Sequence, residues 1–139
     1  MKIGFQKTVE SGYVFIPQVT TSGEYYEFNV VSLDVSLPGP VSSYASVDAT
    51  VLVDGRADDG FKFYLNDQVF HAETGDGLSA GRCFSDCRII DNWYRRQVTK
   101  KVNLTSQRNI LKIVAFDAGA PLRFAQVWNA KITITAMGR

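Results

Sequence analysis

The chain has 139 residues, of which 45% are hydrophobic and 21% are charged, and its formal net charge is +1. These values are typical of one folded globular domain, and they exclude a disordered or collagen-like chain. A charge this close to zero provides no field to attract nucleic acid or an anionic membrane, so neither is expected as a partner.

The first residues predict no targeting or membrane-spanning segment. The stretch MKIGFQKTVESGYVFIPQV lacks the continuous apolar run of a secretory signal. No stretch of the chain approaches the about 18 apolar residues that a membrane span needs. We therefore expect a protein made in the cytoplasm, or an excised domain, with no membrane insertion.

Most of the chain has the alternating pattern and the β-branched and aromatic content of strands. The expected strands are 13–17, 25–37, 46–54, 61–71, 93–104, 109–117 and 122–135. Turn signals rich in Gly, Pro, Asn and Asp separate them, and only a single helical turn fits, near 86–91. The sequence thus predicts one all-β domain over 1–139, an antiparallel β-sandwich of jelly-roll type with little or no helix.

Alternation also predicts which side chains face the core. Phe61, Phe63 and Leu65 share one face of their strand, and Ile132 and Ile134 should point inward. The one dense basic group is expected on the solvated side of a strand and comprises Arg95, Arg96, Lys100 and Lys101.

The longest stretch without strand character is 72–92, and loops of that length inside a compact domain are often functional. It contains Cys83 and Cys87, for which free thiols, a local disulfide and a contribution to a metal site are all open. Free thiols are favoured because no signal peptide is present. His71, the single histidine, is expected at the surface or in the core rather than in a catalytic arrangement, and no known catalytic motif is present.

Asp58 and Asp59 stand side by side before Gly60, although adjacent carboxylates repel each other. Three explanations are open. Asp58 could cap a tight turn while Asp59-Gly60 opens a hairpin, the pair could hold a cation, or the pair could bond directly to a ligand.

The motifs around this pair occur in a recognisable order. Ala57-Asp58-Asp59-Gly60 is followed by Phe63-Tyr64-Leu65-Asn66, and further on come Val102, Leu104, Asn109, Leu111, Ile113, Ala115, Asp117 and Gly119. This order resembles the galactose-binding-type jelly rolls and the protective-antigen-type carbohydrate-binding domains, over roughly 45–135. Asp67 departs from the pattern, because a glycine usually follows the asparagine, and the two cysteines have no counterpart in it.

The resemblance implies a ligand site. In the calcium-dependent protective-antigen-type domains, adjacent aspartates hold a Ca²⁺ that contacts sugar hydroxyls, and this role falls on Asp58 and Asp59. Further oxygen ligands could come from Asp76, Asp86, Asn66 or Asp117, since Ca²⁺ takes six to eight oxygens.

Aromatic side chains beside the long loop would supply a stacking platform for a sugar. Trp93 and Tyr94 follow the loop directly, and because neighbours in a strand point to opposite faces, one of them is expected to face outward. Core packing is the favoured role of both Trp93 and Trp128, with sugar stacking as the alternative, whereas Tyr44 is expected to be exposed. The candidate ligand-binding residues are Asp58, Asp59, Asn66, Trp93 and Tyr94.

These observations favour a non-enzymatic binding module whose partner is a glycan or a cell-surface receptor. A phage or virion component fits as well, because such a protein reaches glycans without a signal peptide by leaving with the particle, and it could be a homo-oligomer or contact other virion proteins. The alternatives are a structural virion or assembly protein that binds no sugar, and an accessory domain of a larger enzyme.

Overall fold

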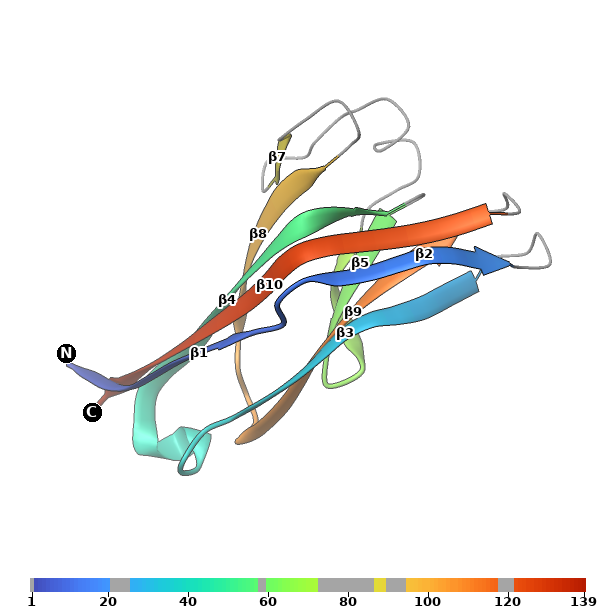
Figure 1. Ribbon diagram of the computed structural model, residues 1–139. Coiled ribbons are helices and arrows are strands. Elements are labelled where there is room, and N and C mark those ends of the chain that lie inside the picture. Colours follow the sequence, from blue (N-terminus) through green and yellow to red (C-terminus); the bar gives the residue numbers. More distant parts are fainter. Residues whose placement is uncertain (1, 21–25, 58–59, 73–86, 90–94, 118–121) are drawn as a thin grey trace.

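The protein is an all-β sandwich of two antiparallel sheets (Figure 1). The computed structural model describes residues 2–20, 26–57, 60–72, 87–89, 95–117 and 122–139. The only helical element within these ranges is one 3₁₀ turn, Val41–Ser43. No described helix is long and apolar enough to cross a membrane. The predicted fold class, an antiparallel β-sandwich, is confirmed.

Six strands form the first sheet, called sheet A, in the order β1-β10-β4-β8-β7, and β2 also pairs with β10. Their bounds are β1 Ile3–Glu10, β2 Val14–Thr20, β4 Tyr44–Ala57, β7 Cys87–Ile89, β8 Arg96–Asn103 and β10 Leu122–Gly138. β1 and β2 lie end to end along the same edge of β10, so the N-terminal segment forms one interrupted edge strand. The two chain ends lie together, because Ile3 pairs with Met137 (Figure 1).

Four strands form the second sheet, called sheet B, in the order β3-β9-β5-β6. Their bounds are β3 Tyr26–Ser36, β5 Gly60–Leu65, β6 Gln68–Ala72 and β9 Arg108–Asp117. β5 and β6 form a hairpin whose two-residue turn is Asn66-Asp67. Both residues have positive φ, 50° and 67°, as a type I′ turn requires. Asp67 therefore occupies the position at which the resemblance led us to expect glycine.

The core lies between the two sheets and follows the predicted alternation. Phe61 and Phe63 are fully buried and Leu65 packs against the core, while Ile132 and Ile134 are fully buried. Burying an Ile or Phe side chain contributes about 1.5–3 kcal/mol relative to leaving it exposed, so these alternating positions supply most of the force that holds the sheets together.

The connection between β4 and β5 corrects one sequence prediction. β4 belongs to sheet A and β5 to sheet B, so Asp58 and Asp59 connect strands of different sheets. The prediction that Asp59-Gly60 opens a hairpin is therefore wrong. Gly60 has φ 155°, a backbone conformation that side-chain-bearing residues rarely adopt.

Other expectations about local structure also fail. The single strand expected over 61–71 is divided by the Asn66-Asp67 turn into β5 and β6. The single helical turn near 86–91 is wrong, because Cys87–Ile89 forms β7 and pairs with β8. Tyr44 is partly buried against the core, because it begins β4 instead of lying in an open loop. β1 was not predicted, since most of its side chains are exposed and only its pairing with the distant β10 makes it a strand.

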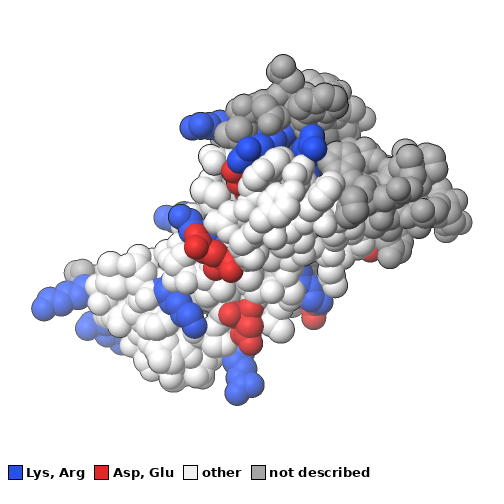
Figure 2. All heavy atoms as spheres, in the orientation of Figure 1, with Lys and Arg blue, Asp and Glu red and all other residues white. Residues whose placement is uncertain are grey.

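A further failure concerns the dense basic group, which is not all solvated. Arg96 is 1% exposed and its guanidinium lies 5.3 Å from the ring centre of Phe61. Neighbouring residues in a strand point to opposite faces, so Arg95 lies on the outer side while Arg96 points into the sandwich. Over the face seen in Figure 2, basic and acidic side chains are interspersed without a continuous patch of one sign.

Candidate functional site

A β-bulge in β10 places Trp128 on the outer face of sheet A. Val127 pairs with Gly55 of β4, and Asn129 pairs with the next residue, Asp54, so Trp128 is the extra residue. Val127 and Ala130 are both fully buried and point inward. The two residues between them therefore both point outward, an arrangement that a regular strand does not allow.

The edge strand holds the bulge in place. Between β1 and β2 the chain turns at Ser11 and Gly12, where Gly12 has φ 71°. The Ser11 N–H donates to the carbonyl of Ala130, and the Ala130 N–H donates to Ser11 Oγ, both at 2.9 Å. The Gly12 N–H donates to Asn129 Oδ1 at 3.1 Å. The break in the edge strand thus pairs with the bulge and fixes the direction of Trp128.

Glycine is required opposite the bulge. A Cβ atom on Gly55 would lie 2.7 Å from the carbonyl oxygen of Gln126 and 3.2 Å from Cα of Val127. Cβ contacts under 3.0 Å essentially never occur, and both neighbours here are backbone atoms that cannot rotate away. Gly55 therefore allows β4 and β10 to approach closely at the point where the bulge forms.

Arg95 and Asp54 hold a fixed position against Trp128. The Arg95 guanidinium lies 4.0 Å from the centre of the Trp128 ring. Its Nε and one terminal nitrogen donate to the two carboxylate oxygens of Asp54, each at 2.8 Å. The side chains of Arg95 and Asp54 are 26% and 13% exposed, so this bidentate pair is partly shielded from water. Bidentate pairs restrict orientation as well as adding energy, so the cation is held against the ring.

A second chain of hydrogen bonds runs across the same face. Arg56 Nε donates to Gln126 Oε1 at 2.9 Å, and Gln126 Nε2 donates to the Tyr13 hydroxyl at 2.7 Å. The Tyr13 ring meets Trp128 edge to face, with 6.4 Å between ring centres. Tyr13 and Phe15 are 56% and 48% exposed.

We call this group the outer-face cluster. It consists of Tyr13, Asp54, Arg56, Arg95, Gln126 and Trp128, with Phe15 beside it. It combines aromatic rings that water reaches with hydrogen-bonding groups that the protein already holds in place. Such a surface can stack against an apolar ligand face and bond to polar groups at its rim.

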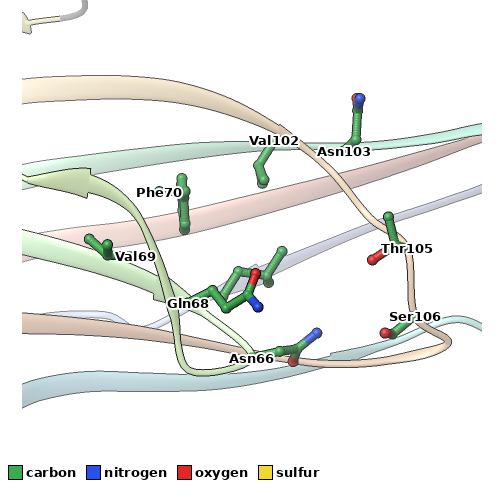
Figure 3. Close-up of a pocket in the computed structure, with 9 residues that line it drawn as sticks. Asn66, Gln68, Val69, Phe70, Val102, Asn103, Thr105 and Ser106 are labelled. Atoms are coloured by element: carbon green, nitrogen blue, oxygen red, sulfur yellow. The ribbon is translucent and has the colours of Figure 1, made fainter.

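A groove lies at the other end of the sandwich, between the β5–β6 hairpin and the end of β8 (Figure 3). Its volume is about 340 Å³. Leu65, Phe70 and Val102 form its apolar part and also pack against the core. The exposed residues around it have amide, hydroxyl or aliphatic side chains and comprise Asn66, Gln68, Val69, Asn103, Thr105 and Ser106.

An amide relay joins the two walls of this groove. Asn66 Nδ2 donates to Asn109 Oδ1 at 3.0 Å, and Asn109 Nδ2 donates to the Ser106 carbonyl at 2.9 Å. Asn66 Oδ1 accepts the backbone N–H of Ile110 at 2.8 Å. Asn109 is fully buried, so its amide depends on these partners. The relay fixes the hairpin turn relative to the loop that follows β8.

The structure places the predicted ligand residues unevenly. Asp58, Asp59, Trp93 and Tyr94 lie outside the described residues, but Ala57 and Arg95, which adjoin them in sequence, lie near paired positions of β4 and β8, since Gly55 pairs with Arg96. The role of these four candidates in ligand binding stays a prediction.

Asn66 lies in the turn at one end of β5, and Gly60 lies at the other end. Six steps of about 3.3 Å separate the two positions by roughly 20 Å. The side-chain oxygen and nitrogen of Asn66 bond to Ile110 and Asn109. Asp117, by contrast, ends β9 beside Phe116, which pairs with Gly60. Asn66 is thus better explained as a structural residue than as an extra calcium ligand.

No group of three or more His, Cys, Asp or Glu side chains that could hold a metal occurs among the residues described by the structure. Asp76, Asp86 and Cys83 lie outside those residues, so the calcium site and the pairing of Cys83 with Cys87 stay predictions. His71 is half-buried in β6, and its ring lies 4.8 Å from that of Phe63.

Sequence reasoning missed most of the outer-face cluster. Trp128 was expected in the core, and this prediction is wrong because the bulge turns the side chain outward. Tyr13, Arg56 and Gln126 had no signal, since their contacts join residues more than 60 positions apart. The Val-Asp-Gly sequence in mid-strand was the one available sign, because glycine inside a strand often marks a bulge or a close backbone approach.

No family model and no curated protein matches the sequence. Among solved structures, the chain is similar to dimeric latent PorU from Porphyromonas gingivalis, with a TM-score of 0.46 and 10% sequence identity. The similarity covers 96% of this chain and 13% of that chain. At this level no property of PorU is transferred to the present chain.

Proposed function

We propose that the chain is a non-enzymatic binding module that recognises a glycan through the outer-face cluster. The observation that supports this most directly is the bulge, which turns the half-buried Trp128 to the outer face beside Tyr13 and the Arg95–Asp54 pair. A large aromatic side chain turned out of the core gives up part of its burial, and full burial of a large apolar side chain contributes about 1.5–3 kcal/mol. Bulges of this kind are found next to functional sites.

Sugars match the chemistry of this surface. The C–H face of a pyranose ring stacks on exposed aromatic rings, and its hydroxyl groups both donate and accept hydrogen bonds. Tyr13 and Phe15 offer exposed ring surface, while Asp54, Gln126 and the two arginines supply acceptors and donors. The polar groups already bond to one another, so little side-chain entropy is lost when a ligand binds.

Calcium is a further part of the proposal, and it rests on the resemblance alone. A Ca²⁺ held by Asp58 and Asp59 would present an open coordination position to sugar hydroxyls. If so, EDTA should abolish glycan binding, and Asp58→Ala with Asp59→Ala should do the same without unfolding the protein. Glycan binding that persists in EDTA would contradict the calcium part of the proposal, and the outer-face cluster alone would remain as the proposed binding surface.

A glycan array tests the proposal. Labelled wild-type protein should bind a defined set of glycans, and Tyr13→Ala should weaken that binding by about tenfold or more, which corresponds to about 1.4 kcal/mol. Ile110→Ala is the matched control, because Ile110 is 45% exposed but lies on sheet B. A protein that binds no glycan on a broad array, or an equal loss in both variants, would contradict the proposed function.

A further inference from the structure

The groove at the far end of the sandwich differs in chemistry from the outer-face cluster. None of its nine lining residues is acidic or basic. A charged ligand would therefore meet no opposite charge among the lining residues and would gain no electrostatic attraction there. The chemistry of the groove thus favours an uncharged ligand.

The arrangement of polar and apolar groups narrows the ligand further. Phe70 and Val102 face the groove from opposite walls, one from the hairpin and one from β8 (Figure 3). Around them lie the amide of Gln68 and the hydroxyl of Thr105, whereas the amide of Asn103, on the opposite face of β8 from Val102, points away from them (Figure 3). These exposed amide and hydroxyl groups both donate and accept hydrogen bonds, as sugar hydroxyls require. The volume of about 340 Å³ lies at the lower end of the range for small-molecule sites.

The groove is also held in shape before any ligand arrives. The Asn66–Asn109–Ser106 relay connects its two walls, and Leu104, inside the loop after β8, bonds through its N–H to the carbonyl of Val47 at 3.0 Å. A preformed site loses less entropy on binding than a mobile one.

We infer that this groove is a second binding site, for one ring of an uncharged sugar, and that the chain is bivalent. Sugar binding in the groove does not depend on the proposed function of the outer-face cluster, whereas bivalency rests on that proposed function. The two sites lie at opposite ends of β8: seven steps of about 3.3 Å from Arg96 to Asn103 give roughly 23 Å. They also open on different surfaces, so one sugar ring cannot occupy both. Two separate sites let one chain cross-link a multivalent glycan.

NMR titration of the full chain with a panel of neutral monosaccharides and their disaccharides tests the groove. At least one sugar should shift the amide signals of Gln68, Phe70 and Asn103 in a saturable manner. About a tenfold rise in NaCl should leave the Kd unchanged, because no charged side chain lines the groove. Gln68→Ala combined with Thr105→Ala should raise the Kd measured from these shifts about tenfold. Ser32→Ala, which deletes an exposed hydroxyl group on sheet B, should leave the Kd unchanged.

The outcomes separate the two proposals. Shifts in the groove without shifts at Tyr13 would support the groove site and contradict the proposed function of the outer-face cluster. Absence of groove shifts with every sugar, or shifts that the double variant does not weaken, would overturn the inference. Bivalency is tested by turbidity. A polymer that carries the sugars bound by the two sites should form a turbid precipitate when mixed with the wild-type protein. It should stay clear with the Gln68→Ala, Thr105→Ala double variant and with Tyr13→Ala. Turbidity that survives either variant would contradict bivalency.

Discussion

Because Asn66 is part of the amide relay, we expect its replacement to lower the free energy of unfolding by a large amount. We also expect most of that loss to depend on the presence of Asn109. Asn66→Gly removes two side-chain hydrogen bonds, to Asn109 Oδ1 and from the Ile110 N–H, but retains a residue that tolerates φ 50°. Asn109 is 0% exposed, so its carbonyl oxygen is left without that donor where water does not reach. An unsatisfied buried group costs about 1–3 kcal/mol and an ordinary hydrogen bond about 1 kcal/mol, so the expected loss is about 3 kcal/mol.

A double-mutant cycle isolates the contribution of the relay. In an Asn109→Ala background the buried amide is already absent, and Asn66→Gly then removes only the bond to Ile110, at about 1 kcal/mol. The predicted coupling between the two positions is thus about 2 kcal/mol. Urea unfolding followed by circular dichroism measures each free energy, provided that the slope with denaturant stays constant across the four proteins.

Asp67→Gly is the control for the turn itself. Asp67 has φ 67° in the same turn, its side chain is 85% exposed, and it forms an ion pair with Lys112 at 3.2 Å. Replacing it relieves the backbone conformation and loses a surface ion pair of little value, so stability should be unchanged or rise by about 0.5 kcal/mol. A coupling below about 0.5 kcal/mol between Asn66 and Asn109, or equal losses at Asn66 and Asp67, would refute the relay.

Two further predictions concern the core and the bulge. Gly55→Ala should destabilise the protein by about 3 kcal/mol, since its Cβ would meet a backbone oxygen at 2.7 Å, whereas Gly39→Ala, with no atom nearer than 3.9 Å, should change stability by less than about 0.5 kcal/mol. Thermal unfolding with equal melting temperatures for the two variants would contradict the close approach. Ile134→Ala should lower the free energy of unfolding by about 3 kcal/mol, because it leaves a cavity in the core, whereas the exposed Ile110→Ala should lower it by less than about 0.5 kcal/mol. Urea unfolding measures both values, and similar losses for the two variants would contradict the assignment of Ile134 to the core and Ile110 to the surface.

The sandwich could be predicted because burial imposes a period of two on each strand separately. Phe61 and Phe63, and likewise Ile132 and Ile134, alternate with polar neighbours, and the pattern is complete within a few residues of sequence. The strand with which a given strand pairs could not be predicted in this way. β1 pairs with a segment more than 120 residues away, and its mostly exposed side chains give no local signal.

The position of Trp128 shows why the candidate site was harder to predict. Alternation counted back from Ile134, Ile132 and Ala130 places Trp128 in the core, and only the bulge between Val127 and Asn129 turns it outward. The bulge depends in turn on Gly55 and on Ser11, residues in two other strands. A site built across three strands in this way cannot be found from the pattern of any one of them.

The recurring asparagines acquire a structural explanation. Asn66 and Asn109 are both part of the motif order that resembles carbohydrate-binding jelly rolls, and in the structure they bond to each other. Their spacing in sequence reflects the joining of a hairpin turn to the neighbouring strand. The two asparagines therefore have a structural role at the edge of the groove.

The most direct test of glycan recognition by the outer-face cluster is an NMR titration that follows the indole N–H of Trp128, assigned with a Trp93→Phe variant. A glycan selected on the array should shift this signal and that of the Arg95 Nε–H together, with the same Kd that the array variants report. If every glycan that binds leaves both signals unmoved, the cluster is not the binding surface, and the bulge at Trp128 does not serve glycan recognition.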